Sequence, residues 1–300
     1  MVNIYDYIAN SKYYKVFKVN DLLLVEYKCM LPKGRVAFWT HNNYFAYILS
    51  GEARYSSRGS DEYIFRKGEG MFVRRGAYIS EQHRQGEYCA LMMFIPDDFI
   101  RSVIDKYPAP PGFQKQNSLE SNQDSIFPVE IDESLNAYFY SVLTYFSKDA
   151  APSSELLKLK FEELILNILM NERKSSLGTC LRSIRECGKI SLSNVMEASF
   201  MYPMDLSEFA RLCARSLSTF KADFKEIYKT SPGKWLIRTR LNYARILLET
   251  TDETVGSIAF KSGFKNTTHF VKVFGDAYGM PPLQYRLKHA GEPEAGTLVR

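Results

Sequence analysis

Short runs of apolar and aromatic residues alternate with turn-forming residues along the first half of the chain. The clearest runs are Leu22–Tyr27, Tyr44–Leu49, Tyr63–Phe65, Met71–Val73 and Tyr88–Ile95. Gly, Ser, Pro and charged residues cluster between them, as at 32–34, 50–52, 57–61, 67–70 and 74–76. Runs of this length between turn signals predict strands. Their close spacing predicts a small β-barrel or sandwich up to about residue 127.

From residue 132 to about 174 the apolar positions recur with helical spacing. Helices are predicted over Ser134–Ser147 and Ser153–Glu172. The second helix has two apolar faces, one formed by Leu157, Phe161, Leu164 and Ile168 and the opposite one by Leu159, Leu166 and Met170. A helix that is apolar on two faces is buried on both. The second face therefore either pairs with another copy of the chain or lies in the core of a single chain. A linker is predicted at 174–178.

The last third of the chain contains a repeat with a period near 50 residues. Its aromatic and proline positions, Phe220, Phe224, Tyr228 and Pro232, recur as Phe270, Phe274, Tyr278 and Pro282. Each copy is predicted to be a short helix, a tight turn and a second helix.

In the first copy, Asp205 is a predicted N-cap for a helix to about Cys213, and Ser216 for a helix to about Tyr228. On that second helix Phe220, Phe224 and Ile227 are predicted to face inward, because they are spaced i, i+4 and i+7. The outward face carries small, polar and basic side chains, which are Ser218, Lys221, Ala222, Lys225 and Lys229.

In the second copy, a helix over Thr254–Lys261 is followed by a turn at 262–263 and a helix capped by Asn266. Its predicted inward side chains are Phe270, Phe274 and Ala277, and its predicted outward residues are Thr268, Val271, Lys272 and Gly275. Such outward faces suit the major groove of DNA, the alternative being solvated helix faces. Two copies in tandem favour DNA.

Between the copies, Ser231 and Pro232 mark the start of a helix over Pro232–Thr250. A helix of this length spans about 27 Å. Successive major grooves on one DNA face repeat every 34 Å or so, and such a rod can present a reading helix to each.

The charge of the chain is concentrated in the same region. Residues 1–182 carry 22 basic and 22 acidic side chains, whereas residues 183–290 carry 16 and 10. The net charge of +5 thus arises from the repeat-containing segment, which fits a polyanionic partner. The length of 300 residues is typical of two domains.

Composition argues against a membrane protein and a secreted protein. No run approaches the roughly 18 apolar residues of a membrane span. The first residues lack the basic and apolar regions of a signal peptide. The five cysteines form no CxxC pair, which favours reduced thiols and a cytoplasmic location.

Sequence motifs of enzymes are also absent. The four histidines, His41, His83, His269 and His289, form no HxH or HExxH pattern. No GxSxG or GxxxxGK[ST] motif occurs, and the glycines at 68 and 70 fit a turn between strands better than a phosphate loop. We therefore expect no catalytic residue, no metal site and no cofactor, with a metal-dependent cupin enzyme as the remote alternative.

The residues of the last third resemble the AraC/XylS family of transcription regulators. The resemblance covers about residues 185–289. It is carried by Arg240, Ala244, Leu247, Leu248, Ile258, Ala259, Gly263, Phe264, Phe270, Phe274, Gly279, Pro282, Tyr285 and Arg286. It implies double-stranded DNA as partner, activation more than repression, and contact with RNA polymerase. The DNA contacts that it implies fall on Ser218, Thr219, Lys221, Ala222, Lys225, Thr267, Thr268, Val271 and Lys272.

Three positions depart from the family pattern. Lys229 stands where a glycine usually ends the first recognition helix in a left-handed conformation, so the helix is expected to continue differently there. Ala222 replaces a common arginine, and Asp223 adds a negative charge. The first recognition helix is therefore expected to contribute less to DNA contact.

The first half is similar to the cupin-like sensor domains of that family, in the branch that includes type III secretion activators and virulence regulators. The similarity lies in residues 47–52 and 67–78. The expected fold is α+β with two domains. A cupin-like β-barrel with a helical dimerisation segment occupies 1–175, the barrel to about 127 and the helices from 132 to 174. An all-α DNA-binding domain of two helix-turn-helix units joined by a linker helix occupies 180–290, and a flexible tail 291–300.

The effector of the first domain is left open. It is a small molecule or a regulatory protein, and a homodimer through the helix at 153–172 is expected. The alternative is a DNA-binding protein that needs no effector and uses its first half only to assemble.

Overall fold

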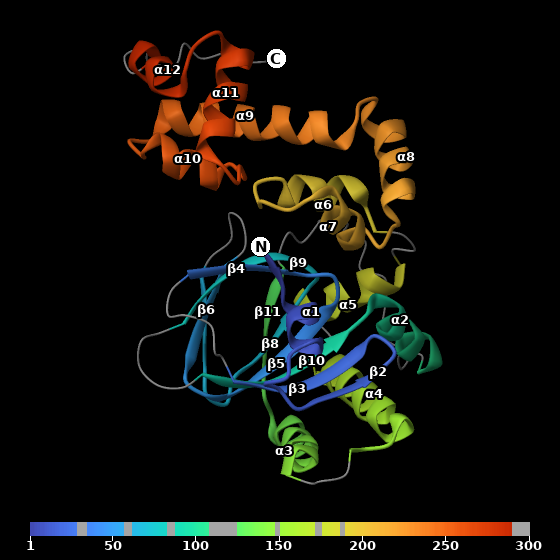
Figure 1. The fold of residues 1–300 in the computed structure, drawn as a ribbon. Helices are drawn as coiled ribbons and strands as arrows, with labels where there is room; N and C mark the ends of the chain where they lie inside the picture. The colour runs from blue at the N-terminus through green and yellow to red at the C-terminus, as the bar shows by residue number, and fades with distance from the viewer. Residues whose placement is uncertain are drawn as a thin grey trace. The chain divides into compact units, whose positions relative to one another are not determined.

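The computed structural model describes residues 1–28, 35–56, 62–82, 88–107, 125–147, 151–171, 176–186 and 190–289. The chain divides into two compact units, Val2–Ile190 and a unit that begins at Ser191. The first is rich in strands, and the second consists of helices and turns over 191–289 (Figure 1). This confirms the predicted two-domain α+β class. The predicted turns at 32–34 and 57–61 and the predicted tail at 291–300 lie outside the described residues.

Two sheets build the first unit. One has the order β1 (Val2–Asn3), β4 (Arg35–Thr40), β9 (Gly76–Gln82), β6 (Glu52–Ser56) and β7 (Tyr63–Arg66). The other has the order β11 (Ile126–Val129), β8 (Gly70–Val73), β5 (Asn43–Ser50), β10 (Cys89–Ile95), β3 (Leu22–Lys28) and β2 (Val16–Val19). Neighbouring strands run antiparallel, except that β1 is parallel to β4.

The second sheet is covered on both faces. All residues of its strand β10 are buried, which explains the uninterrupted apolar run. Ala90, Met92 and Phe94 lie in the core between the two sheets. Leu91, Met93 and Ile95 lie in a second core, against helices. Successive side chains of a strand point to opposite faces, so one strand contributes to both cores.

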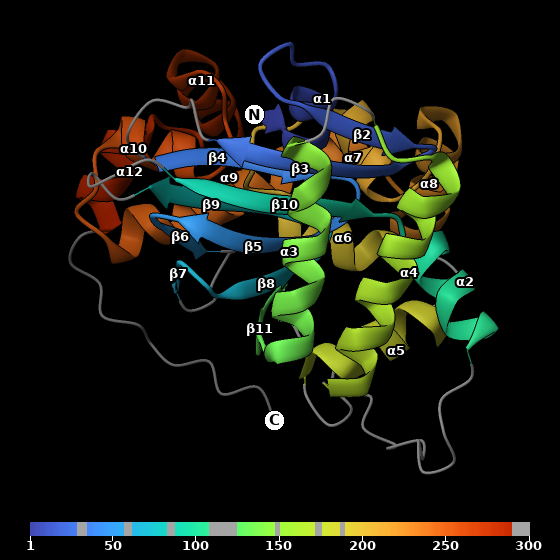
Figure 2. The same ribbon diagram turned by 90° about the horizontal axis from the view of Figure 1, so that it is seen from below.

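Helices complete the first unit. They are α1 (Ile4–Ala9), α2 (Asp97–Lys106), α3 (Glu133–Ser147), α4 (Ser154–Asn171) and α5 (Ser176–Glu186). Helices α3 and α4 lie across the outer face of the second sheet (Figure 2). Phe139 of α3 stacks on Tyr47 of β5, with ring centroids 4.4 Å apart. The apolar helix faces that the sequence predicted thus pack onto this sheet.

Helix α4 exposes part of its second apolar face. Leu157, Phe161, Leu164 and Ile168 are buried, as predicted. Leu166 is half-buried against the same core. In contrast, 56% of Leu159 and 62% of Met170 remain exposed. Of the two alternatives for this face, burial in the core of a single chain therefore does not hold for these two residues.

The division between the units falls later than the sequence indicated. Part of the predicted linker, Ser176–Gly178, opens helix α5 instead. Leu177, Cys180, Leu181 and Ile184 of α5 are buried in the core that also contains α3 and α4. Because this helix packs on the first unit, the boundary lies at Ile190 rather than between 175 and 180.

The second unit comprises the helices α6 (Leu192–Ser199), α7 (Leu206–Leu212), α8 (Leu217–Tyr228), α9 (Pro232–Thr250), α10 (Val255–Lys261), α11 (Thr267–Tyr278) and α12 (Pro282–His289). Helices α8 and α11 lie toward opposite ends of α9 (Figure 1). The predicted bounds of α9 are confirmed at both ends. Within the described parts of the chain, no helix is long and apolar enough to cross a membrane.

Candidate DNA interface

Local hydrogen bonds start the first helix-turn-helix unit. Asp205 and Glu208 form a capping box at α7, in which each side chain accepts a hydrogen bond from the backbone amide of the other residue. Ser216 accepts from the amide of Thr219 at 3.2 Å and so caps α8. The turn between the helices contains Ala214 with a φ of 51°. Both predicted caps are confirmed.

The second unit repeats this construction with other residues. Thr254 caps α10, and Asn266 caps α11 by accepting from the amides of Thr268 and His269. The turn between the helices contains Gly263 with a φ of 88°. The predicted helix–turn–helix order is thus present in both copies.

The inward faces of α8 and α11 are aromatic. Phe220, Phe224, Phe270 and Phe274 are completely buried. The ring of Phe224 stacks on Tyr228 at 4.6 Å, and that of Phe274 lies 4.5 Å from Tyr278. Two predicted inward residues are not buried, since 52% of Ile227 is exposed and Ala277 is exposed too. Both lie in the last turn of their helix.

The outward faces carry the residues expected to contact DNA. On α8, Ser218, Thr219, Lys221, Ala222 and Lys225 are all exposed. At its start the hydroxyl of Ser216 lies 2.9 Å from those of both Ser218 and Thr219. These hydroxyls and the free amides of the first turn can donate to a phosphate, which the helix dipole also favours.

On α11, Thr268 and Lys272 are exposed. Thr267 and Val271 are half-buried, and Val271 packs against the core of the second helix-turn-helix unit. Fewer of the expected DNA contacts are therefore exposed on α11 than on α8. Thr268 and Lys272 are spaced i and i+4, which places them one above the other on a single face.

The structure explains how two departures from the family pattern, Asp223 and Lys229, are accommodated. The carboxylate of Asp223 accepts a hydrogen bond from Nε of Arg215 at 2.7 Å, so its negative charge is paired. Sequence reasoning missed Arg215, which lies eight residues earlier in the turn before α8. Lys229 ends α8 with a left-handed φ of 53°, as Gly279 ends α11 with a φ of 75°. The expectation that the helix continues differently at Lys229 is wrong.

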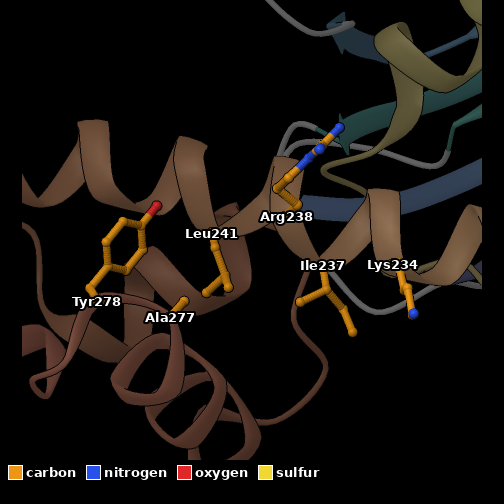
Figure 3. Close-up of a pocket in the computed structure, with 6 residues that line it drawn as sticks. All are labelled: Lys234, Ile237, Arg238, Leu241, Ala277 and Tyr278. Carbon is orange, nitrogen blue, oxygen red and sulfur yellow. The ribbon is translucent and has the colours of Figure 1, made fainter. Parts of the chain in front are cut away.

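Helix α9 connects the two helix-turn-helix units. Ser231 caps it, Pro232 occupies its first turn, and its 19 residues span about 28 Å. An open pocket of about 410 Å³ lies where the first half of α9 approaches the end of α11 (Figure 3). It is lined by Lys234, Ile237, Arg238 and Leu241 of α9 and by Ala277 and Tyr278 of α11. The two cations add positive charge to the middle of the unit, which the sequence analysis did not single out.

Among the residues that the structure describes, no group of three or more His, Cys, Asp or Glu side chains is arranged to hold a metal ion. His41 instead lies 3.0 Å from the amide nitrogen of Asn3, and His269 and His289 are outside the core. His83 lies outside the described residues.

Two family models match the chain, one in each of its two compact units. A family model described as the ExsA N-terminal regulatory domain matches residues 43–179. A model described as a helix-turn-helix domain matches residues 209–288. The first match lies within the strand-rich unit and the second within the helical one.

Relatives match across most of the chain. The virulence regulon transcriptional activator VirF of Yersinia enterocolitica is 25% identical over 241 residues, which are 80% of this chain and 87% of VirF. The transcriptional regulator ExsA of Pseudomonas aeruginosa is 24% identical over 80% of this chain and 84% of its own length. Among solved structures, apo ToxT of Vibrio cholerae is 13% identical, with 89% and 97% of the two chains covered and a TM-score of 0.43.

Proposed function

This chain is a DNA-binding transcription regulator of the AraC family, and from that premise we propose that it activates transcription by reading two successive major grooves. Helix α8 reads one groove and α11 the other, while the first unit regulates this contact. A regulator of this kind works where the genome and RNA polymerase are found, which places it in the cytoplasm and makes RNA polymerase its partner.

One observation carries the DNA-reading part of the proposal. Two helix-turn-helix units project the same kind of outward face from the two ends of one continuous helix. Its length of about 28 Å approaches the repeat of successive major grooves. The proposed contacts are Ser218, Thr219, Lys221, Ala222 and Lys225 on α8, and Thr267, Thr268, Val271 and Lys272 on α11. The exposed residues contact bases and phosphates, and Thr267 and Val271, which are half-buried, contact DNA through the atoms that remain exposed.

The proposed regulatory domain is a cupin-like barrel made of the two sheets of Val2–Ile190. Its interior contains tyrosines as well as aliphatic side chains. Burial and the neighbouring hydroxyl of Tyr55 raise the pKa of both Tyr44 and Tyr88 far above the usual range. In this proposal these hydroxyls are the polar groups that an effector inside the barrel would contact. A regulatory protein bound outside is the other candidate, which the resemblance to secretion activators supports.

We also propose that the chain dimerises through α4. The exposed Leu159 and Met170 support this, because the core of one chain leaves them uncovered. Replacing Leu159 with Glu is expected to weaken self-association in sedimentation equilibrium. The matched control is Leu157→Glu, which attacks the buried face of the same helix and is expected to unfold the domain instead. Wild-type protein that sediments as a monomer at every concentration contradicts the dimer.

The DNA-reading proposal is tested by selection from a pool of random duplexes with full-length protein. A defined sequence should be enriched, and its affinity should fall about a thousandfold between 50 and 200 mM salt if six or so phosphates are contacted. A fragment that begins at Ser191 should bind the same sequence. Recovery of random sequences only, at every salt concentration, contradicts sequence-specific reading.

A further inference from the structure

Arg240 of α9 ties the linker helix to the first helix-turn-helix unit. Its Nε donates to the carbonyl oxygen of Phe200 at 2.7 Å, and its Nη2 donates to that of Tyr202 at 2.8 Å. Both carbonyls lie in the connection between α6 and α7. Burial lowers the pKa of Arg240 to about 10, so the guanidinium remains charged at neutral pH. Hydrogen bonds from a charged donor are stronger than those between neutral groups.

The turn of the second helix-turn-helix unit packs on the same connection. A Cβ on Gly263 would lie 2.7 Å from the carbonyl oxygen of Met201 and 2.8 Å from Nε of Arg240. Real carbon atoms do not approach so closely, and the φ of 88° is also unfavourable for other residues. Ser262 and Phe264 on either side are buried. Glycine thus allows the turn of the second helix-turn-helix unit to pack against the segment that leads into the first one.

A charge effect crosses the same boundary. The hydrogen bond from Ser207, those from the backbone amides of Glu208 and Ser207, and the positive charge of Lys265 hold the pKa of Asp205 below its usual range. Lys265 follows the turn of the second unit, and Asp205 caps the first helix of the first unit. The positive charge of Lys265 thus acts on the cap of the first unit, in addition to the contacts of Arg240 and Gly263.

We propose that this junction, formed by Arg240, Gly263 and the carbonyls of 200–202, locks the two helix-turn-helix units into one rigid reader. Arg240 is then a positioning residue that sets the distance between the two DNA elements that the protein accepts. Its guanidinium is engaged by two carbonyls and reads no base. The inference rests on the proposed function and adds to it a rule for the spacing of the DNA site.

The physical consequence follows from the geometry of DNA. One added base pair moves the second element by about 3.4 Å and rotates it by about 35°. A reader that is locked cannot follow this displacement, so one recognition helix loses its base contacts. A reader joined by α9 alone can bend and twist at the ends of that helix. It follows the displaced element, but it also binds the optimal site less tightly because binding must then order it.

The experiment uses full-length protein and the duplex that wild type enriches from a random pool. Three duplexes are compared at fixed salt: the selected one, one with a base pair inserted between the two elements, and one with a base pair deleted there. Wild type should lose about tenfold or more in affinity for both altered duplexes, because a displaced helix forfeits at least one good base contact.

Arg240→Ala removes both hydrogen bonds across the junction. It should bind the selected duplex less tightly, and its affinity for the altered duplexes should fall by no more than about threefold further. The matched control is Arg238→Ala, which removes an exposed cation two residues away on the same helix. That variant should bind all three duplexes more weakly by one common factor, so its spacing ratio stays at the wild-type value.

Arg240→Lys keeps the charge but replaces the planar fork with a single ammonium group, so an intermediate spacing ratio is expected. It decides the matter if Arg240→Ala does not fold in circular dichroism. The proposal is overturned by a wild type that tolerates both altered duplexes, or by a folded Arg240 variant with the wild-type ratio. Failure of wild type to enrich any duplex would instead refute the proposed function itself.

Discussion

The two helix-turn-helix units differ most at the turns between their helices. In both turns one residue adopts a left-handed conformation, Ala214 in the first unit and Gly263 in the second. Ala214 is exposed, whereas a side chain on Gly263 would strike the carbonyl of Met201 and Arg240. The backbone conformation is therefore shared, but only the second turn lacks room for a side chain. Ala214 thus faces solvent in the first turn, whereas Gly263 lies against α9 and the segment that leads into the first unit.

The ends of the recognition helices sharpen this comparison. Lys229 and Gly279 end α8 and α11 with φ values of 53° and 75°. No atom lies within 4 Å of a Cβ built on Gly279. Glycine at this end therefore relieves only backbone strain, and lysine can take its place in the other copy. Each glycine has a different residue at the matching position of the first copy, and only at Gly263 does a neighbour occupy the side-chain space.

The largest effect is expected from the paired aromatic residues, where the two units are alike. Phe224→Ala and Phe274→Ala each remove a completely buried ring and should cost about 3–5 kcal/mol of stability. Urea unfolding followed by the fluorescence of Trp235, which packs against Phe224 and Tyr228, measures the first change directly. Circular dichroism measures the second. A loss confined to one of the two variants would show that the copies do not have equivalent cores.

Substitution of the two glycines of the second helix-turn-helix unit should distinguish the cost of a steric clash from the cost of backbone strain. Gly263→Ala combines a left-handed alanine with a close contact and is expected to cost about 2–4 kcal/mol. Gly279→Ala has the strain alone and should cost about 1 kcal/mol. Thermal unfolding of both variants gives the comparison. Equal losses would mean that the backbone at 201 moves aside, and the close packing of the two units would then be of no consequence.

The affinity for DNA should fall when the exposed lysine of either recognition helix is removed. Lys272→Ala should leave the thermal unfolding unchanged and cost about 1–3 kcal/mol of DNA binding if the lysine contacts a base, or a smaller, sequence-independent amount if it contacts phosphate. Lys221→Ala on α8 is the equivalent test in the first unit. Titration with the selected and a scrambled duplex distinguishes the two cases. Unchanged affinity of Lys272→Ala for every duplex would remove α11 from the reading surface.

The smallest effect is a gain. Lys229→Gly should stabilise the protein by up to about 1 kcal/mol, because glycine adopts the left-handed conformation without strain. Binding of DNA serves as the control and should change little if Lys229 is not a contact. Lower stability of the variant would indicate that the freedom of glycine in the unfolded chain outweighs the relief of strain.

The local features of the helical unit follow from residues that are close together in the chain. The bounds of α9 and the caps Asp205, Ser216 and Asn266 were all predicted, because capping and periodicity depend on residues within one or two turns. The same holds for the buried aromatic faces, which repeat at helical spacing. In the strand-rich unit the apolar runs predicted β3, β5, β7, β8 and β10, whereas β2, β4, β6, β9 and β11 were not recognised.

Packing between elements establishes which surfaces are covered and which groups far apart in the chain meet. It assigned α5 to the first unit, exposed Ile227 and Ala277, and paired Asp223 with Arg215. It also brought Arg240 to the carbonyls of Phe200 and Tyr202, some 40 residues away in the chain. The position of Arg240 in the sequence does not reveal its hydrogen-bond partners, because those partners are backbone oxygens, which every residue has. Such contacts exist only once the helices have packed.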